Sequence, residues 1–327
     1  MKIVITDHRF PDVAQERRAV EAAGWTLVVA QTTDEQELCS VCRDADAILT
    51  VRAPITRRVI ESMQHCKIIV RYGIGVDTVD IPAATQRGIL VANVPDYCVD
   101  EVSDHALTLL MMLSRQIIPS IDVARQDRWV VTNLPPLHRL RGQVCGLVGC
   151  GKIGSLLAGK TKALGMRVVI HDPYLSEARA REMGAELVSL DALLAQADFI
   201  SLHAPLNDET HHLFGEAVFA KMKSGASIIN TSRGGLIDET ALLAALDSGK
   251  LFGAGLDVVE SETAVTPVRT ALVNHPKVIV TAHTAWLSVE ARATLQLRAI
   301  EQAVACLKGE MPYGLVNREL AKPKSRA

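Results

Sequence analysis

Three glycines with the spacing of a dinucleotide-binding turn give the first chemical signal in the sequence. Gly149, Gly151 and Gly154 follow the apolar run 144–148 and precede Leu156–Ala158, which has helical spacing. The first glycine permits a tight turn, the second lets the backbone approach a pyrophosphate, and the third lets the helix pack on the strand. The amino end of that helix attracts the anion. The pattern predicts a dinucleotide site, although a purely structural glycine turn would look the same.

An acidic residue stands where such a site would bind ribose. The next apolar run, Val168–Ile170, is followed by His171 and Asp172, and Asp172 lies 21 residues beyond Gly151. A carboxylate there accepts hydrogen bonds from the adenosine ribose hydroxyls and repels a 2′-phosphate. We therefore expect NAD rather than NADP, unless the aspartate is unrelated to the glycine turn.

Three ionisable residues follow later apolar runs, where open α/β sheets place their ligands. They are Arg233, Glu262 and His283. A guanidinium can bind a carboxylate and a carbonyl oxygen together, and a histidine exchanges protons near neutral pH. A neighbouring carboxylate favours the charged form of the imidazole and orients the ring. Each residue alone could be structural, but together with a dinucleotide site they indicate hydride transfer with acid–base assistance.

A regular alternation of strands and helices must position these residues. Short β-branched runs alternate with helical stretches from end to end, which indicates βαβ units and parallel sheets. Eleven predicted strands exceed what one sheet usually carries, so we expect two sheets. The predicted strands cover residues 3–5, 27–29, 47–49, 68–70, 89–91, 144–148, 168–170, 199–202, 227–229, 252–256 and 278–280.

The break between the two sheets is predicted in the middle of the chain. Residues 99–118 are predicted to form one long helix, with apolar positions at helical spacing, followed by an irregular stretch that ends at residues 133–136. The C-terminal part of the chain, from 288 onward, contains mainly one predicted helix, Val289–Leu307, too little for a third domain. We therefore expect this part to pack on the first domain.

The sequence thus predicts an α/β fold with two doubly wound parallel-sheet domains. An inner Rossmann dinucleotide-binding domain, residues 99–287, is inserted in a discontinuous flavodoxin-like outer domain, residues 1–98 and 288–327. Apolar residues make up 48% of the 327-residue chain and aromatic residues only 4%, as expected for strands buried on both faces by helices.

Charge and cysteine content narrow the function classes. Lys and Arg number 35 against 37 Asp and Glu, so we expect no nucleic-acid or acidic-membrane partner, which would need a basic excess. The apolar run 3–5 is too short for a signal sequence and no apolar run approaches the length of a membrane span, so we expect a cytoplasmic protein. Seven cysteines fit reduced thiols. Cys39 and Cys42 form a CxxC without a second pair, so we expect no metal site.

Several motifs in combination resemble the D-isomer-specific 2-hydroxyacid dehydrogenase family over nearly the whole chain. The motifs are residues 71–77 (RYGIGVD), 93–95 (NVP), 149–154 (GCGKIG), 203–205 (HAP), 230–234 (NTSRG), 255–258 (GLDV) with Glu262, and 281–283 (TAH). The resemblance implies an NAD-dependent enzyme that interconverts a small 2-oxo acid and the (R)-2-hydroxy acid. It also implies a homodimer, for which the long helix from Val99 would serve as an arm.

The resemblance also implies a role for each matching residue. Arg233 would hold the substrate carboxylate and polarise the carbonyl, His283 would donate the proton in reduction, and Glu262 would be its partner. The backbone amides of Ile74 and Gly75 would meet the substrate carboxylate. The implied cofactor contacts are Gly149, Gly151, Lys152, Ile153, Gly154, Asp172, His203, Ala204, Pro205, Thr231, Ser232, Asp257 and Trp286.

Two further expectations concern the charge of the substrate and the branch of the family that the chain resembles. Arg52 and Arg71 follow predicted outer-domain strands, so they would bind a second anionic group on the substrate, unless they are surface arginines paired with acids. Trp286 would then limit substrate length. The stretch His283–Trp286 is similar to the branch of the C-terminal-binding-protein corepressors and their bacterial enzyme relatives. An NAD(H)-sensing scaffold with little turnover is therefore the alternative function.

Overall fold

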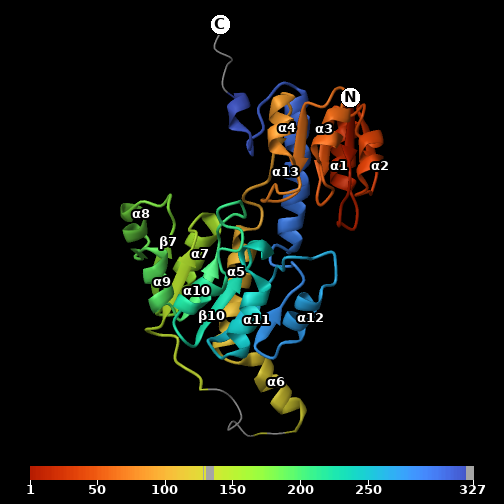
Figure 1. The fold of residues 1–327 in the computed structure, drawn as a ribbon. Helices are drawn as coiled ribbons and strands as arrows, with labels where there is room; N and C mark the ends of the chain where they lie inside the picture. The colour runs from red at the N-terminus through yellow and green to blue at the C-terminus, as the bar shows by residue number, and fades with distance from the viewer. Residues whose placement is uncertain (128, 130–135, 322–327) are drawn as a thin grey trace. The chain divides into compact units, whose positions relative to one another are not determined.

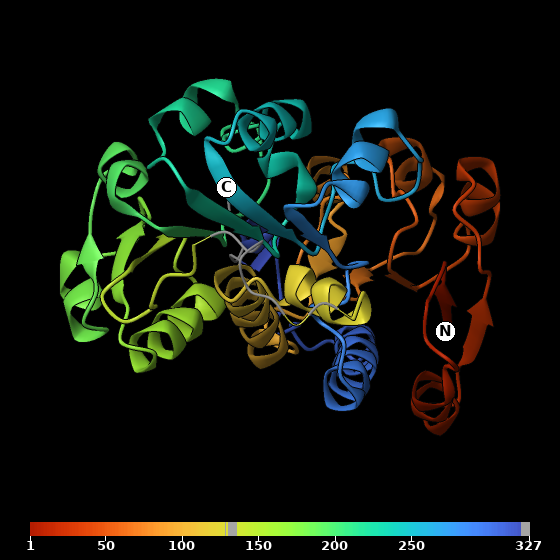
Figure 2. The ribbon, with the colours of Figure 1, turned by 90° about the horizontal axis from the view of Figure 1, so that it is seen from below.

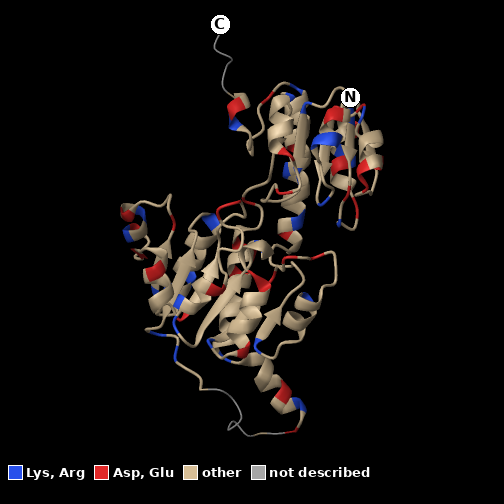
Figure 3. Cartoon of the chain, viewed as in Figure 1, with Lys and Arg blue, Asp and Glu red and all other residues tan. Residues whose placement is uncertain are grey.

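The computed structural model describes residues 1–127, 129 and 136–321 of the chain. The chain divides into two compact units, one formed by residues 1–97 with the chain from Ser288 onward, the other by Cys98–Leu287 (Figure 1). Acidic and basic residues are interspersed along the chain in both units (Figure 3). The predicted end of the irregular stretch, residues 133–135, lies outside the described residues.

The first unit is a five-stranded parallel sheet with strand order β2-β1-β3-β4-β5. Its strands are β1 (Lys2–Ile5), β2 (Thr26–Val29), β3 (Ala47–Thr50), β4 (Ile68–Arg71) and β5 (Leu90–Ala92). Its helices are α1 (Ala14–Ala22), α2 (Glu35–Val41), α3 (Arg57–Ser62), α4 (Ile81–Gln86), α13 (Val289–Leu307) and the 3₁₀ turn η3 (Arg318–Ala321). The central strand β3 is fully buried, and its neighbours β1 and β4 are buried except at Lys2 and Arg71, as in sheets covered on both faces.

The C-terminal helix belongs to the first unit. The Ser288 hydroxyl caps its amino end by accepting from the Ala291 amide. Leu295, Ala299, Ile300 and other small or apolar residues on one side of α13 are buried against α1, β3 and β4. Burial of this apolar stripe explains why the chain returns to the first sheet after it has formed the whole of the second unit.

The second unit is a seven-stranded parallel sheet with strand order β12-β11-β10-β9-β6-β7-β8. The strands are β6 (Val144–Val148), β7 (Arg167–His171), β8 (Glu186–Leu187), β9 (Phe199–Leu202), β10 (Ala226–Asn230), β11 (Leu251–Leu256) and β12 (Val278–Val280). All eleven predicted strands are present, and the two-residue β8 was not predicted. The strand order reverses between β6 and β9, where such sheets bind ligands beyond their carboxyl ends.

Helices lie on both faces of this sheet (Figure 2). The helices are α5 (Val99–Ser114), α6 (Ile117–Arg125), α7 (Lys152–Ala163), α8 (Glu177–Glu182), α9 (Leu190–Gln196), α10 (Glu216–Lys221), the 3₁₀ turn η2 (Gly234–Leu236), α11 (Glu239–Asp247) and α12 (Pro267–Asn274). Two glycines of β11, Gly253 and Gly255, allow α5 to pack close against the sheet. A Cβ on Gly253 would stand 2.9 Å from Leu113, and one on Gly255 would stand 2.9 Å from Leu109.

The prediction of one helix over residues 99–118 is wrong at its carboxyl end. Helix α5 ends at Ser114, and α6 begins at Ile117 after a bend of 57°. Gln116 adopts a left-handed conformation with φ +50°, which no helix interior tolerates. Pro119 could not continue α5, because its ring would clash with the carbonyl four residues earlier. In the first turn of a new helix it is tolerated.

Among the described residues, no single helix is long and apolar enough to span a membrane. Helices α5 and α6 reach the necessary length and apolar content only when they are taken together, as a bent pair.

Candidate active site

The three glycines of the turn between β6 and α7 differ in their surroundings: two are required by the fold and one faces open space. Gly149 has φ +86°, and a Cβ there would lie 2.8 Å from the backbone of His203 and Ala204. A Cβ on Gly154 would lie 2.7 Å from the Gly149 carbonyl oxygen. A Cβ on Gly151 would meet nothing within 4 Å. The fold therefore requires Gly149 and Gly154, whereas Gly151 borders open space at the amino end of α7, where a pyrophosphate would fit.

Asp172 lies beside this turn, directly after β7. Its Oδ2 accepts from the Cys150 amide at 2.7 Å and its Oδ1 accepts from the Tyr174 amide at 2.8 Å. A carboxylate has about four acceptor positions, so these two bonds leave capacity for hydroxyl donors. The structure thus brings the acidic residue predicted from spacing into contact with the glycine turn.

A buried hydroxyl follows β10. Thr231 is 8% exposed, and its Oγ1 has no hydrogen-bond partner among the described residues. Buried polar atoms are rarely left without a partner, because burial removes their bonds to water. The next residue, Ser232, donates from its hydroxyl to the Leu202 carbonyl at 2.7 Å. Thr231 is therefore the member of this segment whose hydroxyl is left for a ligand.

The turn that carries Arg233 is fixed from two sides. The buried Asn230 side chain donates to the Arg233 carbonyl at 2.8 Å, and its oxygen accepts from the Ser232 amide at 3.0 Å. A Cβ on Gly234 would overlap the carbonyl of Val259, so only glycine allows this backbone approach. The approach places the Arg233 turn beside the segment that leads to Glu262.

His283 and Glu262 form the ion pair that the sequence predicts. His283 Nδ1 lies 2.6 Å from Glu262 Oε1, and both side chains are partly exposed. Arg269 on α12 donates to the carbonyl oxygens of Ser261 and Glu262 at 3.3 Å, which holds the loop that carries the carboxylate. His283 has φ +54°, an uncommon conformation for a residue other than glycine. Such backbone strain is often found at functional sites.

Asp257 holds the loop of His283 in place. Its buried carboxylate accepts from the Thr281 hydroxyl at 2.6 Å and from the amides of Thr284 and Ala285 at 2.9 Å. Its backbone carbonyl also accepts from the His283 amide at 2.9 Å. Three of its roughly four acceptor positions are thereby used within the chain. The sequence assigned Asp257 to the cofactor, and its contacts within the chain are with the loop that carries His283.

The segment 203–205 passes close to the glycine turn. The His203 amide donates to the Val148 carbonyl at 2.8 Å, and His203 Nε2 lies 2.9 Å from the Ser201 hydroxyl. Burial lowers the pKa of His203 to about 4, so the ring is neutral at pH 7. His203 therefore contributes shape rather than positive charge to the turn.

The four substrate residues predicted in the outer domain belong to the first unit. Asp7, which is buried at the end of β1, accepts from the backbone amides of residues 51–53 at 2.7–3.2 Å and so fixes the loop that carries Arg52. Arg71 ends β4, and its guanidinium covers Gly73 so closely that a Cβ there would overlap it. Ile74 and Gly75 follow, and the side-chain amide of Asn93 donates to the Ile74 carbonyl at 2.6 Å.

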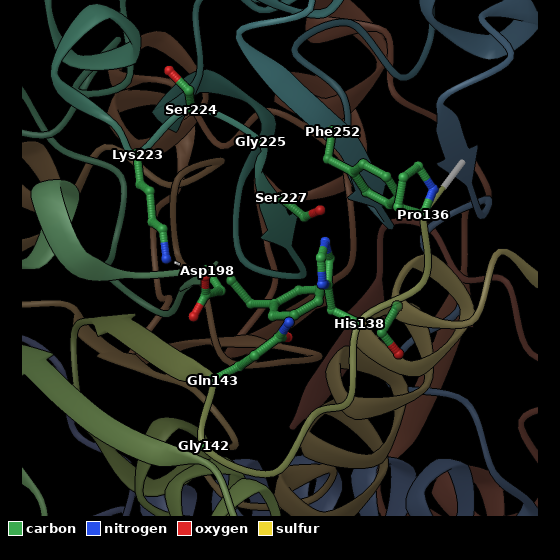
Figure 4. Close-up of a pocket in the computed structure, with 12 residues that line it drawn as sticks. Pro136, His138, Gly142, Gln143, Asp198, Lys223, Ser224, Gly225, Ser227 and Phe252 are labelled. Carbon is green, nitrogen blue, oxygen red and sulfur yellow. Dashed lines mark hydrogen bonds and ion pairs between the residues drawn. The ribbon is translucent and has the colours of Figure 1, made fainter.

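The second unit contains a hollow of about 600 Å³ (Figure 4). It is lined by residues that precede or begin strands of the sheet, among them Gln143, Asp198, Gly225 and Phe252. These residues mark the amino ends of the strands, whereas Arg233, Glu262 and His283 follow carboxyl ends. The chemistry predicted from the sequence therefore does not map to this hollow.

Comparison with known proteins decides the family. A family model described as D-isomer specific 2-hydroxyacid dehydrogenase, NAD binding domain, matches residues 107–285, more than half of the chain.

The chain belongs to the D-isomer-specific 2-hydroxyacid dehydrogenase family.

Relatives support this membership over most of the length. The chain is 36% identical to a glyoxylate reductase of Korarchaeum cryptofilum, with 86% of this chain and 85% of that protein covered. It is 39% identical to a D-3-phosphoglycerate dehydrogenase of Mycobacterium bovis over 88% of this chain, but spans only 55% of that protein. A D-lactate dehydrogenase from Aquifex aeolicus, solved with NAD and lactic acid, has a TM-score of 0.86 at 28% identity, with 94% and 96% of the two chains covered.

The enzyme class follows from these comparisons. The protein is an NAD-dependent D-2-hydroxyacid dehydrogenase with a Rossmann NAD-binding domain. The open space at Gly151 and the unpartnered Thr231 hydroxyl, which bonds none of the described residues, fit the cofactor. The relatives named above are enzymes and lend no support to the scaffold function. Similarity to the corepressor branch stays a prediction.

Some residues of the site were not singled out from the sequence. His105 on α5 lies 2.9 Å from the Thr281 hydroxyl and 3.6 Å from Asp257. It thus supports the loop that carries His283 from a helix that the sequence analysis interpreted only as a dimer arm. Asp7 was missed as well, and Asn230 was named only as part of the motif 230–234, without a role. An acid directly after the first buried strand was a signal that could have identified Asp7.

Proposed function

We propose that this enzyme reduces a small 2-oxo acid to the (R)-2-hydroxy acid, and catalyses the reverse reaction, with Arg233, Glu262 and His283 as its catalytic residues. The observation that carries the proposal is the 2.6 Å bond between His283 and Glu262, on a loop fixed by Asp257. NADH, when bound, supplies the hydride for C2 of the substrate. The chain supplies the carboxylate anchor and the proton.

The ion pair assigns the two nitrogens of His283 to different tasks. Glu262 occupies Nδ1, which orients the ring and stabilises the protonated imidazole. Proton exchange with the substrate oxygen is therefore assigned to Nε2. In reduction His283 donates this proton, and in oxidation it accepts it. Arg233 binds the substrate carboxylate and polarises the carbonyl, because a guanidinium can bond both oxygens at once.

The proposed cofactor contacts follow the geometry of the second unit. The open face at Gly151, with Lys152 and Ile153 in the first turn of α7, would hold the pyrophosphate, and Asp172 the adenosine ribose. The Thr231 hydroxyl would bond the nicotinamide end. Further contacts are proposed for Gly149, Gly154, His203, Ala204, Pro205, Ser232, Asp257 and Trp286.

The first unit is proposed to bind the substrate through the backbone amides of Ile74 and Gly75 and through Arg52 and Arg71. Asp7 fixes the backbone of residues 51–53, so the Arg52 side chain starts from a rigid loop. A second anionic group on the substrate, such as a phosphate, sulfonate or carboxylate, matches two guanidinium groups. Trp286 would then limit the length of the substrate.

A substrate panel tests the reaction and its specificity. NADH oxidation is measured with glyoxylate, hydroxypyruvate, pyruvate, branched 2-oxo acids and dianionic 2-oxo acids. Turnover should require Arg233, so Arg233→Gln should lose kcat/KM while NADH affinity, read by fluorescence, is retained. Absence of turnover on every 2-oxo acid, with NADH still bound tightly, would contradict the proposed reaction.

The second-anion proposal is tested by comparing a dianionic with a neutral-tailed 2-oxo acid of equal size. A desolvated charge pair is worth about 1.5–3 kcal/mol, so Arg52→Ala and Arg71→Ala should each lower the preference for the dianion by roughly 10- to 100-fold. Arg58→Ala is the control, because Arg58 forms an exposed pair with Glu35. Equal turnover of pyruvate and every dianion, unchanged in both variants, would show that the two arginines are structural.

Assembly as a homodimer and a cytoplasmic location are part of the same proposal. Helix α6 buries none of its residues within the chain, and its Ile117, Ile118 and Ile121 are 38–40% exposed. Such a row of exposed isoleucines favours contact with a second copy. The seven cysteines are free thiols, which fits a reducing compartment. Sedimentation of the wild type and of Ile118→Glu tests the dimer, which only the wild type should form.

A further inference from the structure

A cluster of metal-binding side chains lies outside the residues assigned to catalysis. His212 Nε2 lies 2.7 Å from Glu260 Oε1, and His211 Nε2 lies 3.8 Å from the same oxygen. The two imidazole rings are stacked, with their centroids 4.0 Å apart and their planes at 21°. One ligand atom from each of the three residues lies within 4.8 Å of the others.

We propose that His211, His212 and Glu260 bind a divalent transition metal ion of the Zn²⁺ class. Zn²⁺ binds imidazole nitrogen and carboxylate oxygen at about 2.0–2.2 Å, so two ligands of a tetrahedral ion stand roughly 3.4 Å apart. The distances of 2.7 and 3.8 Å lie on either side of that value. Small side-chain adjustments would therefore admit the ion.

The donor set selects the class of metal. Two of the three ligands are imidazoles, which suit Zn²⁺, Ni²⁺ or Cu²⁺, whereas Mg²⁺ and Ca²⁺ prefer oxygen. The side chains of His211 and Glu260 are 55% and 42% exposed and that of His212 is 36% exposed. Solvent can therefore reach the site and provide the remaining ligand. The site exchanges metal with the solution instead of enclosing it.

The backbone around the cluster is held in position before any ion binds. The His212 amide donates to the Gly235 carbonyl at 2.8 Å, and residues 214 and 237 form a parallel bridge next to it. The Glu260 amide donates to the buried carboxylate of Glu239 at 2.7 Å. His212 has φ +51°, a backbone conformation that is maintained only when its surroundings fix it.

The metal would join two segments that are far apart in the sequence. His211 and His212 follow the 203–205 segment, whereas Glu260 stands two positions before Glu262. An ion bound to all three would restrict the turn 207–213 and the loop 258–262 together. Ligands so widely separated along the chain leave no spacing motif, which explains why the sequence does not reveal the site.

Binding is measured on the tag-free full-length chain with Zn²⁺ by calorimetry and with Co²⁺ by its visible absorption. We expect one equivalent bound. His211→Asn, His212→Asn and Glu260→Gln should each weaken it by more than the roughly 10- to 100-fold that loss of an outer-shell hydrogen bond costs. A 100-fold excess of Zn²⁺ over Kd should raise Tm by roughly 5 °C, reversibly with chelator. Exchange of the amides of 207–213 and 258–262 should slow.

Two variants serve as controls. Glu209→Gln removes an exposed carboxylate from the same turn, and His275→Asn removes a histidine from another surface pair, with Asp247. Both should bind Zn²⁺ like the wild type. His211→Asn should keep its melting temperature without metal, because its side chain is more than half exposed. Absence of stoichiometric binding, or binding that survives all three ligand variants, would overturn the proposal.

Discussion

The charge of Glu262 should raise the rate of 2-oxo acid reduction, because it stabilises the protonated His283 that donates the proton. Replacing it with glutamine keeps the size and a hydrogen-bond acceptor but removes the negative charge 2.6 Å from His283 Nδ1. Two unit charges at that distance attract by about 1.6 kcal/mol at the dielectric constant of water and by about 6 kcal/mol at an effective dielectric near 20. Since both side chains are partly exposed, we use the lower value.

That value corresponds to roughly a factor of ten in rate, since about 1.4 kcal/mol in the activation barrier is tenfold. The kcat of reduction should therefore fall about tenfold in Glu262→Gln, whereas NADH affinity hardly changes. Asp247→Asn is the matched control, because it removes the carboxylate beside another histidine, His275, in the same unit. An unchanged kcat in Glu262→Gln would refute the assignment of Glu262 as the partner of His283.

Four further predictions concern the NAD-binding unit. NADH should be preferred over NADPH by on the order of 10²-fold in kcat/KM. The reason is that a 2′-phosphate about 4 Å from Asp172 is repelled by roughly 4 kcal/mol per charge pair before screening. Equal kcat/KM values for the two cofactors would contradict this prediction. Gly149→Ala should destabilise the fold by at least about 1–2 kcal/mol in denaturant titrations, from the positive φ alone, whereas Gly151→Ala should keep its Tm and lose NADH affinity. Thr231→Val should leave the apoenzyme Tm unchanged and weaken NADH binding about tenfold, since its hydroxyl bonds no described residue. Burial lowers the pKa of His203 to about 4, so the unfolding free energy should fall as the pH drops from 6.5 to 4, by up to about 1.4 kcal/mol per unit, and less steeply in His203→Asn.

Local patterns predicted the strands and most of the helices. Runs such as Val144–Val148 are buried on both faces, so their apolar composition identifies them directly. Helix α13 has the predicted bounds because a capping serine precedes it and a stripe of apolar residues runs along it. The bend after Ser114 escaped prediction because it depends on the left-handed backbone of a glutamine, which has no sequence signature.

Residues of the site could be predicted where a single side chain of the right chemical type follows the end of a strand. Arg233, Glu262, His283 and Asp172 were found in that way, and the structure joins His283 to Glu262 and Asp172 to the glycine turn. The residues that hold these side chains in position were harder to predict from the sequence. Asp257 contacts the loop of His283 through backbone amides, and such contacts depend on the folded path of the chain rather than on spacing.

The configuration of the product tests the central claim most directly. The wild type and His283→Gln are each mixed with one equivalent of NADH and an excess of the best 2-oxo acid of the panel other than glyoxylate, whose product glycolate has no stereocentre. The 2-hydroxy acid is then separated by chiral chromatography. The wild type should form the (R)-isomer alone. The variant should bind NADH as tightly and form almost no product. An (S) or racemic product, or undiminished turnover by His283→Gln, would contradict the account.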